Sequence, residues 1–106
     1  MPTLRNHRLV SADFSSAYGW YEEECPGLGM EFAAEFRRAY QKLCLGPLLY
    51  SVRFSSIRRL NLDRFPYGIF YVVKPDEIRV LAVLHASRDS EHILAERRQT
   101  FFAREF

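Results

Sequence analysis

The stretch AVLHASRD, from Ala82 to Asp89, places two chemically able side chains at the end of an apolar segment. His85 could exchange a proton near neutral pH. The guanidinium of Arg88 could hold a phosphate or carboxylate through two hydrogen bonds, although it cannot act as a base. The stretch therefore indicates a recognition or catalytic site at the end of a buried strand. The simpler interpretation is that His85 is structural and that Arg88 pairs with Asp89.

A second group of cations lies between Arg53 and Arg64, where the sequence has four arginines and one acid, Asp63. Arg58 and Arg59 are adjacent within this group. The acids gather elsewhere, mainly at positions 22–24, 31 and 35. We therefore expect one basic face and one acidic face. The alternative is an exposed strand surface with solvated arginines, which is their commonest environment.

Two amphipathic helices must support these groups in the first half of the chain. Either Ser11 or Asp13 could cap the first helix, and Cys25-Pro26-Gly27 ends it. Gly46-Pro47 ends the second. Their apolar faces recur at helical spacing and comprise Phe14, Ala17, Tyr18 and Tyr21, then Phe32, Phe36, Ala39 and Leu43. The two helices form a hairpin, with Glu22–Glu24 at a helix end where the dipole disfavours acids.

The hydrophobic period changes to two after the second helix, which predicts strands at 57–62, 67–73 and 78–84. The last two are apolar on both faces and belong at the centre of a sheet that helices cover on at least one side. A short strand is expected at 5–10, and a helix or docking arm from Ser90 to Phe106. The order β-α-α-β-β-β with a C-terminal helical tail predicts an α+β fold, in which the hairpin covers a mostly antiparallel sheet.

Composition limits the class of protein. The 106 residues suit one domain, 1–106, and the 15 basic and 13 acidic side chains give a net charge of +2, too small to argue for nucleic-acid binding. No apolar run is long enough to span a bilayer. Cys25 and Cys44 lack metal-binding spacing and are expected to be free thiols in a reducing cytoplasm. We predict no metal and no cofactor.

Three segments in register resemble the RelE/ParE superfamily of toxins from bacterial type II toxin–antitoxin pairs. They are WYEEECPGLG (Trp20–Gly29), RFPYGIFY (Arg64–Tyr71) and VLHASRD (Val83–Asp89). The resemblance extends from the first strand through Arg98. It implies an α+β toxin that is neutralised by an acidic antitoxin encoded alongside it.

The superfamily has two kinds of activity, so the fold alone does not decide the function. RelE-like members cut messenger RNA in the ribosome, whereas ParE-like members poison DNA gyrase. In the RelE pattern an arginine follows the tyrosine of the third strand, but here Tyr67 precedes Gly68, which has no side chain. The two RelE lysines of the preceding strand fall on Arg59 and Asn61, so one cation of two remains.

The rest of the RelE pattern is also incomplete. Arg88 matches the arginine after the last strand, but the terminal aromatic falls on Leu94, and His92 could replace it only after a backbone shift. A nuclease needs a base, an acid and cations on the phosphate. The candidates Arg59, Arg88 and His92 supply less than that, which favours a toxin that is not an enzyme.

We therefore predict a cytoplasmic ParE-like toxin that inhibits growth by binding a protein target, expected to be DNA gyrase. One alternative is a ribosome-dependent mRNA endonuclease. Another is a non-toxic remnant that still binds its antitoxin, whose gene could be cloned without its neighbour. The residues expected to contact the target or the antitoxin are Trp20, Arg58, Arg59, Arg64, His85 and Arg88. No contact with a membrane is expected.

Overall fold

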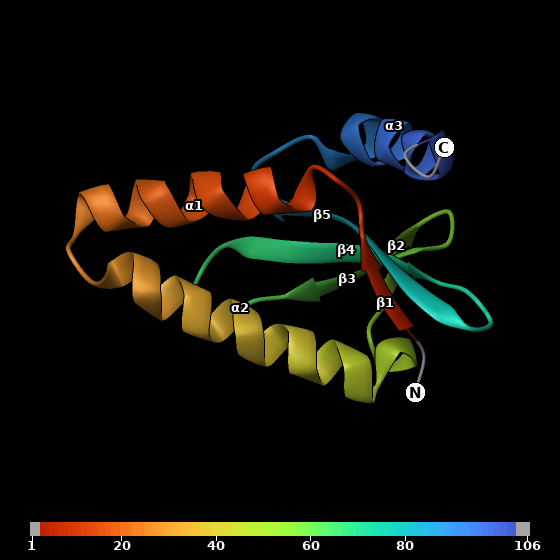
Figure 1. Ribbon diagram of the computed structural model, residues 1–106, viewed down its shortest axis with the longest axis horizontal. Helices are drawn as coiled ribbons and strands as arrows, with labels where there is room; N and C mark the ends of the chain where they lie inside the picture. The colour runs from red at the N-terminus through yellow and green to blue at the C-terminus, as the bar shows by residue number, and fades with distance from the viewer. Residues whose placement is uncertain (1–2, 104–106) are drawn as a thin grey trace.

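The computed structural model of the protein describes residues 3–103, without the side chains of 54, 102 and 103. Two long helices form a hairpin beside a twisted sheet, and a third helix packs on the sheet from the other side (Figure 1). The elements are β1 (Thr3–Asn6), α1 (Val10–Glu24), α2 (Leu28–Leu45), the 3-10 turn η1 (Pro47–Leu49), β2 (Val52–Phe54), β3 (Ile57–Asn61), β4 (Tyr67–Val73), β5 (Glu77–His85) and α3 (Ser90–Ala103). Residues 104–106 of the predicted tail lie outside the described residues.

The five strands form one sheet in the order β1-β5-β4-β3-β2. β1 runs parallel to β5, and the other pairs are antiparallel. The central position of β4 and β5 and the mostly antiparallel sheet were predicted correctly. Phe70 pairs with Ala82 and Tyr71 with Val80, so Leu81 is an extra residue that forms a β-bulge in β5.

The sheet separates two apolar clusters. α1 and α2 cover the larger one, to which β4 contributes Ile69 and Tyr71. α3 covers the smaller one, to which β4 contributes Phe70 and Val72 and α3 contributes Leu94. The tail is therefore a docked helix, and both faces of the sheet are covered. Within residues 3–103, no helix is both long and apolar enough to cross a membrane.

The predictions differ from the structure at the start of the fold. β1 ends at Asn6, and α1 already begins at Val10 without a side-chain cap. The expected cap by Ser11 or Asp13 was wrong because both residues lie inside the helix. The sequence analysis also missed β2, whose three residues are too few to show a period.

The turn between α1 and α2 explains the acids at the end of α1. The carboxylate of Glu22 accepts hydrogen bonds of 2.9 Å from the backbone N–H groups of Gly27 and Gly29. These groups belong to the N-terminus of α2, where a negative charge is favourable. A Cβ atom at position 29 would lie 2.8 Å from a Glu22 oxygen and 3.0 Å from the carbonyl oxygen of Tyr18, so the close approach requires glycine. Glu22 thus caps the following helix.

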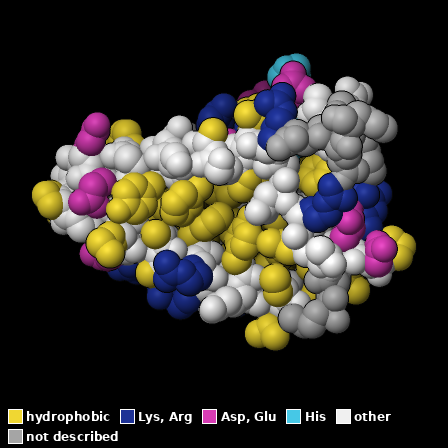
Figure 2. Space-filling view, viewed as in Figure 1, with side chains coloured by type: hydrophobic (Ala, Val, Ile, Leu, Met, Phe, Trp, Pro, Cys, Tyr) yellow, Lys and Arg dark blue, Asp and Glu magenta, His cyan; other side chains and the backbone are white. Residues whose placement is uncertain are grey.

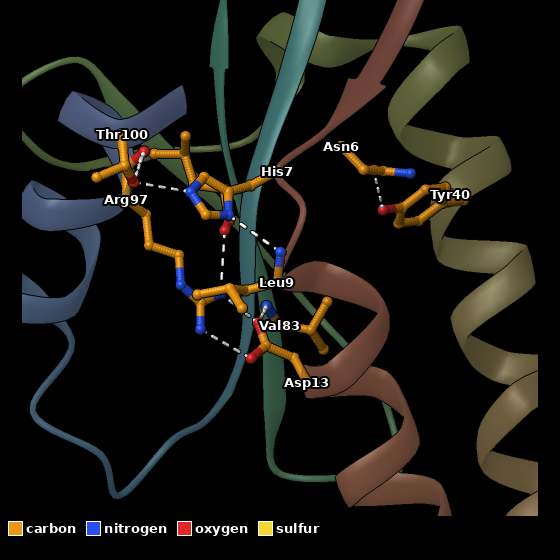
Figure 3. A network of polar contacts seen from close by, with 9 residues as sticks. Asn6, His7, Leu9, Asp13, Tyr40, Val83, Arg97 and Thr100 are labelled. Atoms are coloured by element: carbon orange, nitrogen blue, oxygen red, sulfur yellow. Dashed lines mark hydrogen bonds and ion pairs between the residues drawn. The ribbon is translucent and has the colours of Figure 1, made fainter. Parts of the chain in front are cut away.

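A buried ion pair joins α1, β5 and α3 (Figure 3). Arg97 donates to both carboxylate oxygens of Asp13, at 2.5 and 2.9 Å. The same carboxylate accepts the backbone N–H of Val83 at 3.0 Å, and Arg97 donates to the carbonyl oxygen of Leu81 at 3.2 Å. β1 reaches only Val80 in its pairing with β5. The ion pair therefore satisfies backbone groups of β5 beyond the end of β1.

His7 forms a second link between the start of the chain and α3 (Figure 3). The ring is buried, its Nδ1 accepts the backbone N–H of Leu9 at 3.1 Å, and its Nε2 lies 2.9 Å from the hydroxyl of Thr100. Since Nδ1 is an acceptor, the Nε2–H donates to Thr100. These bonds hold the turn between β1 and α1 against α3.

We predict that Asp13→Ala lowers the free energy of unfolding by about 3 kcal/mol, because it leaves the buried guanidinium of Arg97 without its counter-charge. Adding Arg97→Met should recover part of the loss by removing that charge. Urea denaturation of the single and double variants measures both effects. A single variant within about 0.5 kcal/mol of the parent would contradict a structural role for the pair.

Candidate functional site

The C-terminal end of β5 meets the end of β3 and the start of β4. Asn61 pairs with Gly68, and Tyr67 pairs with His85, so these positions share one end of the sheet. An open cavity of about 430 Å³ lies there, lined by Arg59, Asn61, Tyr67, Ala86 and the loop 62–66. His85, Arg88 and His92 do not line it.

His85 is held by its own turn. Its Nδ1 accepts the backbone N–H of Ser87 at 2.9 Å and lies 2.8 Å from the Ser87 hydroxyl. Its ring meets Tyr67 edge-on, with 5.2 Å between the ring centroids. Burial raises the pKa of the Tyr67 hydroxyl, and the charge of Arg88 opposes that rise only in part. Tyr67 therefore stays protonated at neutral pH and cannot serve there as a base.

Arg88 is the most available cation of the predicted set. Its backbone N–H donates to the carbonyl oxygen of His85 at 3.1 Å, which fixes the turn. Its side chain is exposed, and no other described residue forms a hydrogen bond or an ion pair with its guanidinium. His92 is also exposed, near the start of α3. Neither residue is close enough to an acid to be neutralised within the described chain.

Arg59 occupies the space above Gly68. Its guanidinium lies 5.1 Å from the centroid of the Phe70 ring, and its Nε donates to the side-chain oxygen of Asn61. A Cβ atom at position 68 would lie 2.5 Å from that Nε. Burial lowers the pKa of Arg59, and the nearby charge of Arg53 lowers it further. The absence of a side chain at position 68 is therefore what lets Arg59 lie flat on the sheet.

The side chain of Arg59 lies on the other face of the sheet from the Tyr67–His85 pair. Arg59 packs on Phe70, whose ring belongs to the cluster under α3. Tyr67 packs against the cluster under α1 and α2, and His85 contacts it there. The side chains of Arg59 and of the Tyr67–His85 pair thus point to opposite faces. Arg59, Arg88 and His92 are not gathered around one cavity.

Two of the predicted binding arginines have partners inside the protein. Arg58 donates to the carbonyl oxygen of Tyr50 at 2.7 Å. Arg64 forms ion pairs of 3.1 Å with Glu31 and 3.2 Å with Glu35. These contacts give both arginines structural roles, and their contact with a partner stays a prediction.

Glu35 anchors the loop 62–66 to α2 and was not singled out in the sequence. Burial alone would raise the pKa of its carboxyl, but hydrogen bonds from the backbone N–H and the guanidinium of Arg64 outweigh burial and lower it. The burial of Glu35 could have been predicted from its spacing. Glu35 lies three residues from Phe32 and four from Ala39, which places it beside the buried stripe of α2.

Trp20 lies on α1 beside Tyr21, whose ring contacts Tyr67 at this end of the sheet. Its side chain is 58% exposed, and its ring meets Tyr21 edge-on at 5.1 Å. An exposed indole on a rigid support suits a protein contact. Among the described residues, no group of three or more His, Cys, Asp or Glu side chains is placed to hold a metal ion.

A helical hairpin packed on a five-stranded sheet defines a small α+β protein, and its described surface offers charged and aromatic side chains. The same fold occurs in a solved structure described as the chromosomal ParDE TA system from P. aeruginosa, with a TM-score of 0.67 and 19% sequence identity. That match covers 82% of this chain and 98% of the other. A comparison with curated proteins gives no match.

The family model described as the ParE toxin of the type II toxin–antitoxin system parDE matches residues 4–90. The chain therefore belongs to the family of ParE toxins. This confirms the predicted family and fold, and a ParDE pair implies an antitoxin as partner. The match ends where α3 begins.

We predict that Glu35→Gln lowers the free energy of unfolding by about 1–3 kcal/mol at pH 7, because the buried hydrogen bonds from Arg64 lose their charged acceptor. The folded pKa lies below the ordinary value of 4.5, so this stabilisation is complete above pH 4.5 and disappears as the pH falls through the lowered pKa. Denaturation at several pH values measures the difference between variant and parent.

Glu31→Gln is the matched control, since Glu31 binds the same guanidinium from an exposed position. Its effect should stay below about 1 kcal/mol. Equal effects of the two substitutions, or a Glu35→Gln difference that does not shrink as the pH falls below 4.5, would contradict the assigned role of Glu35.

Proposed function

We propose that this ParE toxin inhibits growth by binding DNA gyrase and that it does not cleave RNA. The observation that carries the proposal is that Arg88 and His92 do not line the cavity that Arg59 and Tyr67 share. Cleavage of RNA needs a base and cations around one phosphate. Here Tyr67 is protonated, the Nδ1 of His85 is occupied by Ser87, and position 68 has no side chain.

The residues proposed to contact the target are those that the protein itself leaves available. Arg88 and Trp20 are exposed and project from rigid supports, the end of β5 and the helical hairpin. A fixed support reduces the entropy that a contact residue loses on binding. Arg58, Arg59 and Arg64 are held by internal contacts and would serve by shaping the surface.

We further propose that the antitoxin neutralises the toxin by covering apolar surface on the hairpin. Hydrophobic side chains line the furrow between α1 and α2 (Figure 2). At one end of this furrow a cavity of about 440 Å³ is bordered by Phe14, Phe36 and Tyr40, whose rings are only half-buried. A disordered antitoxin segment that folds on binding could cover such a surface.

Pulse-labelling of DNA and protein synthesis, minutes after induction of the toxin alone, tests the proposed target. We expect DNA synthesis to stop first while translation continues, and purified toxin to block supercoiling of relaxed plasmid by gyrase. Arg88→Ala should weaken that block about tenfold, as expected for the loss of one charge-assisted contact of about 1.4 kcal/mol.

Arg37→Ala is the matched control, because Arg37 is an exposed arginine on α2 away from the end of β5. It should inhibit gyrase like the parent. An early stop in translation with cleaved messages would instead establish the endonuclease alternative. If neither synthesis stops, the chain is a non-toxic partner of its antitoxin.

A further inference from the structure

A second open cavity lies where the C-terminal part of α2 and η1 approach the β2–β3 edge of the sheet. It has a volume of about 360 Å³ and is lined by Lys42, Arg53 and Arg59 together with Leu49, Tyr50 and Ser51. We call it the Arg53 cavity. No residue of this cavity except Arg59 belongs to the contact set considered above.

The Arg53 cavity carries uncompensated positive charge. Asp63 is the single acid among its lining residues, and its side chain is 80% exposed and 3.8 Å from Lys42. Arg53 forms no ion pair with any other described residue. Arg53 and Arg59 line the same cavity. Burial lowers the pKa of Arg59, and the nearby charge of Arg53 lowers it further. An anionic group between them would relieve this repulsion.

Two exposed leucines lie at or next to the Arg53 cavity, since Leu49 lines it and Leu48 precedes Leu49 in η1. Leu48 is 66% exposed and Leu49 80% exposed, although both belong to η1, which is firmly held. The hydroxyl of Tyr71 donates to the carbonyl oxygen of Pro47 at 2.6 Å, and Arg58 donates to that of Tyr50 at 2.7 Å. The protein thus holds two leucine side chains in contact with water beside three cations. Their exposure is unfavourable, and burial in a complex would remove that free-energy cost.

The combination of three cations with two exposed leucines indicates the kind of ligand. A nucleic-acid backbone would satisfy the cations but would leave Leu48 and Leu49 in water. A protein segment that alternates carboxylates with apolar side chains would satisfy both. The short outer edge of β3 adds backbone groups that an extended segment could bind, since β2 pairs with β3 only as far as Arg59.

We infer that the Arg53 cavity is a docking site for an acidic, partly apolar segment of the antitoxin, whose carboxylates lie between Lys42, Arg53 and Arg59 and whose apolar side chains cover Leu48 and Leu49. This inference rests on the proposed neutralisation by an antitoxin. It places a charged anchor on the opposite side of α2 from the aromatic furrow.

The test uses the full-length toxin and the purified antitoxin encoded beside it. Titration calorimetry should show that the double substitution Lys42→Glu with Arg53→Glu raises the dissociation constant about 30-fold or more, because both charges are reversed. Leu48→Ser with Leu49→Ser should raise it about tenfold. All four side chains are exposed, so circular dichroism melts should match the parent.

Arg37→Glu is the control, since it reverses an exposed arginine of the same helix outside the cavity. It should leave the dissociation constant within about twofold of the parent. An unchanged constant for both double variants would overturn the inference. So would binding of a 20-base-pair DNA duplex that the charge reversal abolishes and the leucine substitutions leave intact, because the cavity would then serve nucleic acid.

The binding measurement with the antitoxin tests this inference independently of the proposed gyrase target. It needs no gyrase, so a toxin that fails to inhibit gyrase leaves the result for the antitoxin standing. If the parent chain does not bind the antitoxin at all, the proposed neutralisation is overturned and this inference with it.

Discussion

The open edge of β5 is the constraint on which the rest of the structure depends. β1 covers this edge only as far as Val80, and the bulge at Leu81 leaves backbone groups that must find other partners. Asp13 and Arg97 supply them from two different helices. A buried ion pair adds little net stability relative to apolar packing, but it allows few alternative arrangements. The start of α1, the position of α3 and the end of β5 are therefore fixed together. Arg88 lies in the turn that comes directly after that end of β5.

The covered sheet also decides where the side chains of β3 and β4 point. Alternation along β3 and β4 directs Arg59 and Tyr67 to opposite faces. Glycine at position 68 then allows the guanidinium of Arg59 to lie against the ring of Phe70. Arg59 and Tyr67 still border one cavity at the end of the sheet, but Arg88 and His92 do not line it. The exposed side chains of the described surface include cations, leucines and aromatic rings, which suit the recognition of other proteins.

The fold was predictable where a pattern repeats along the chain. Several residues of each element indicate burial independently, so one misleading residue does not change the prediction. These elements are the two apolar strands and the helix with the stripe of Phe32, Phe36, Ala39 and Leu43. Contacts made once between distant residues were not predictable. The sequence does not show that Glu22 caps α2. It also does not show that Arg64 donates hydrogen bonds to Glu35 rather than to solvent. One signal was visible in advance, since Arg97 lies on the same side of its helix as Leu94 and Phe101, and a charge within an apolar stripe needs a buried partner.

The helix α3 follows the segment that the ParE family model matches, yet it completes an ion pair that begins at Asp13, inside that segment. A chain that ended near Ser90 would bury a carboxylate without its cation and expose the apolar face that Leu94 covers. Asp13 and α3 thus stabilise the fold only when both are present. A relative without this helix is expected to carry a different residue at the position of Asp13, so the presence of the helix should be inherited jointly with an acid in the first turn of α1.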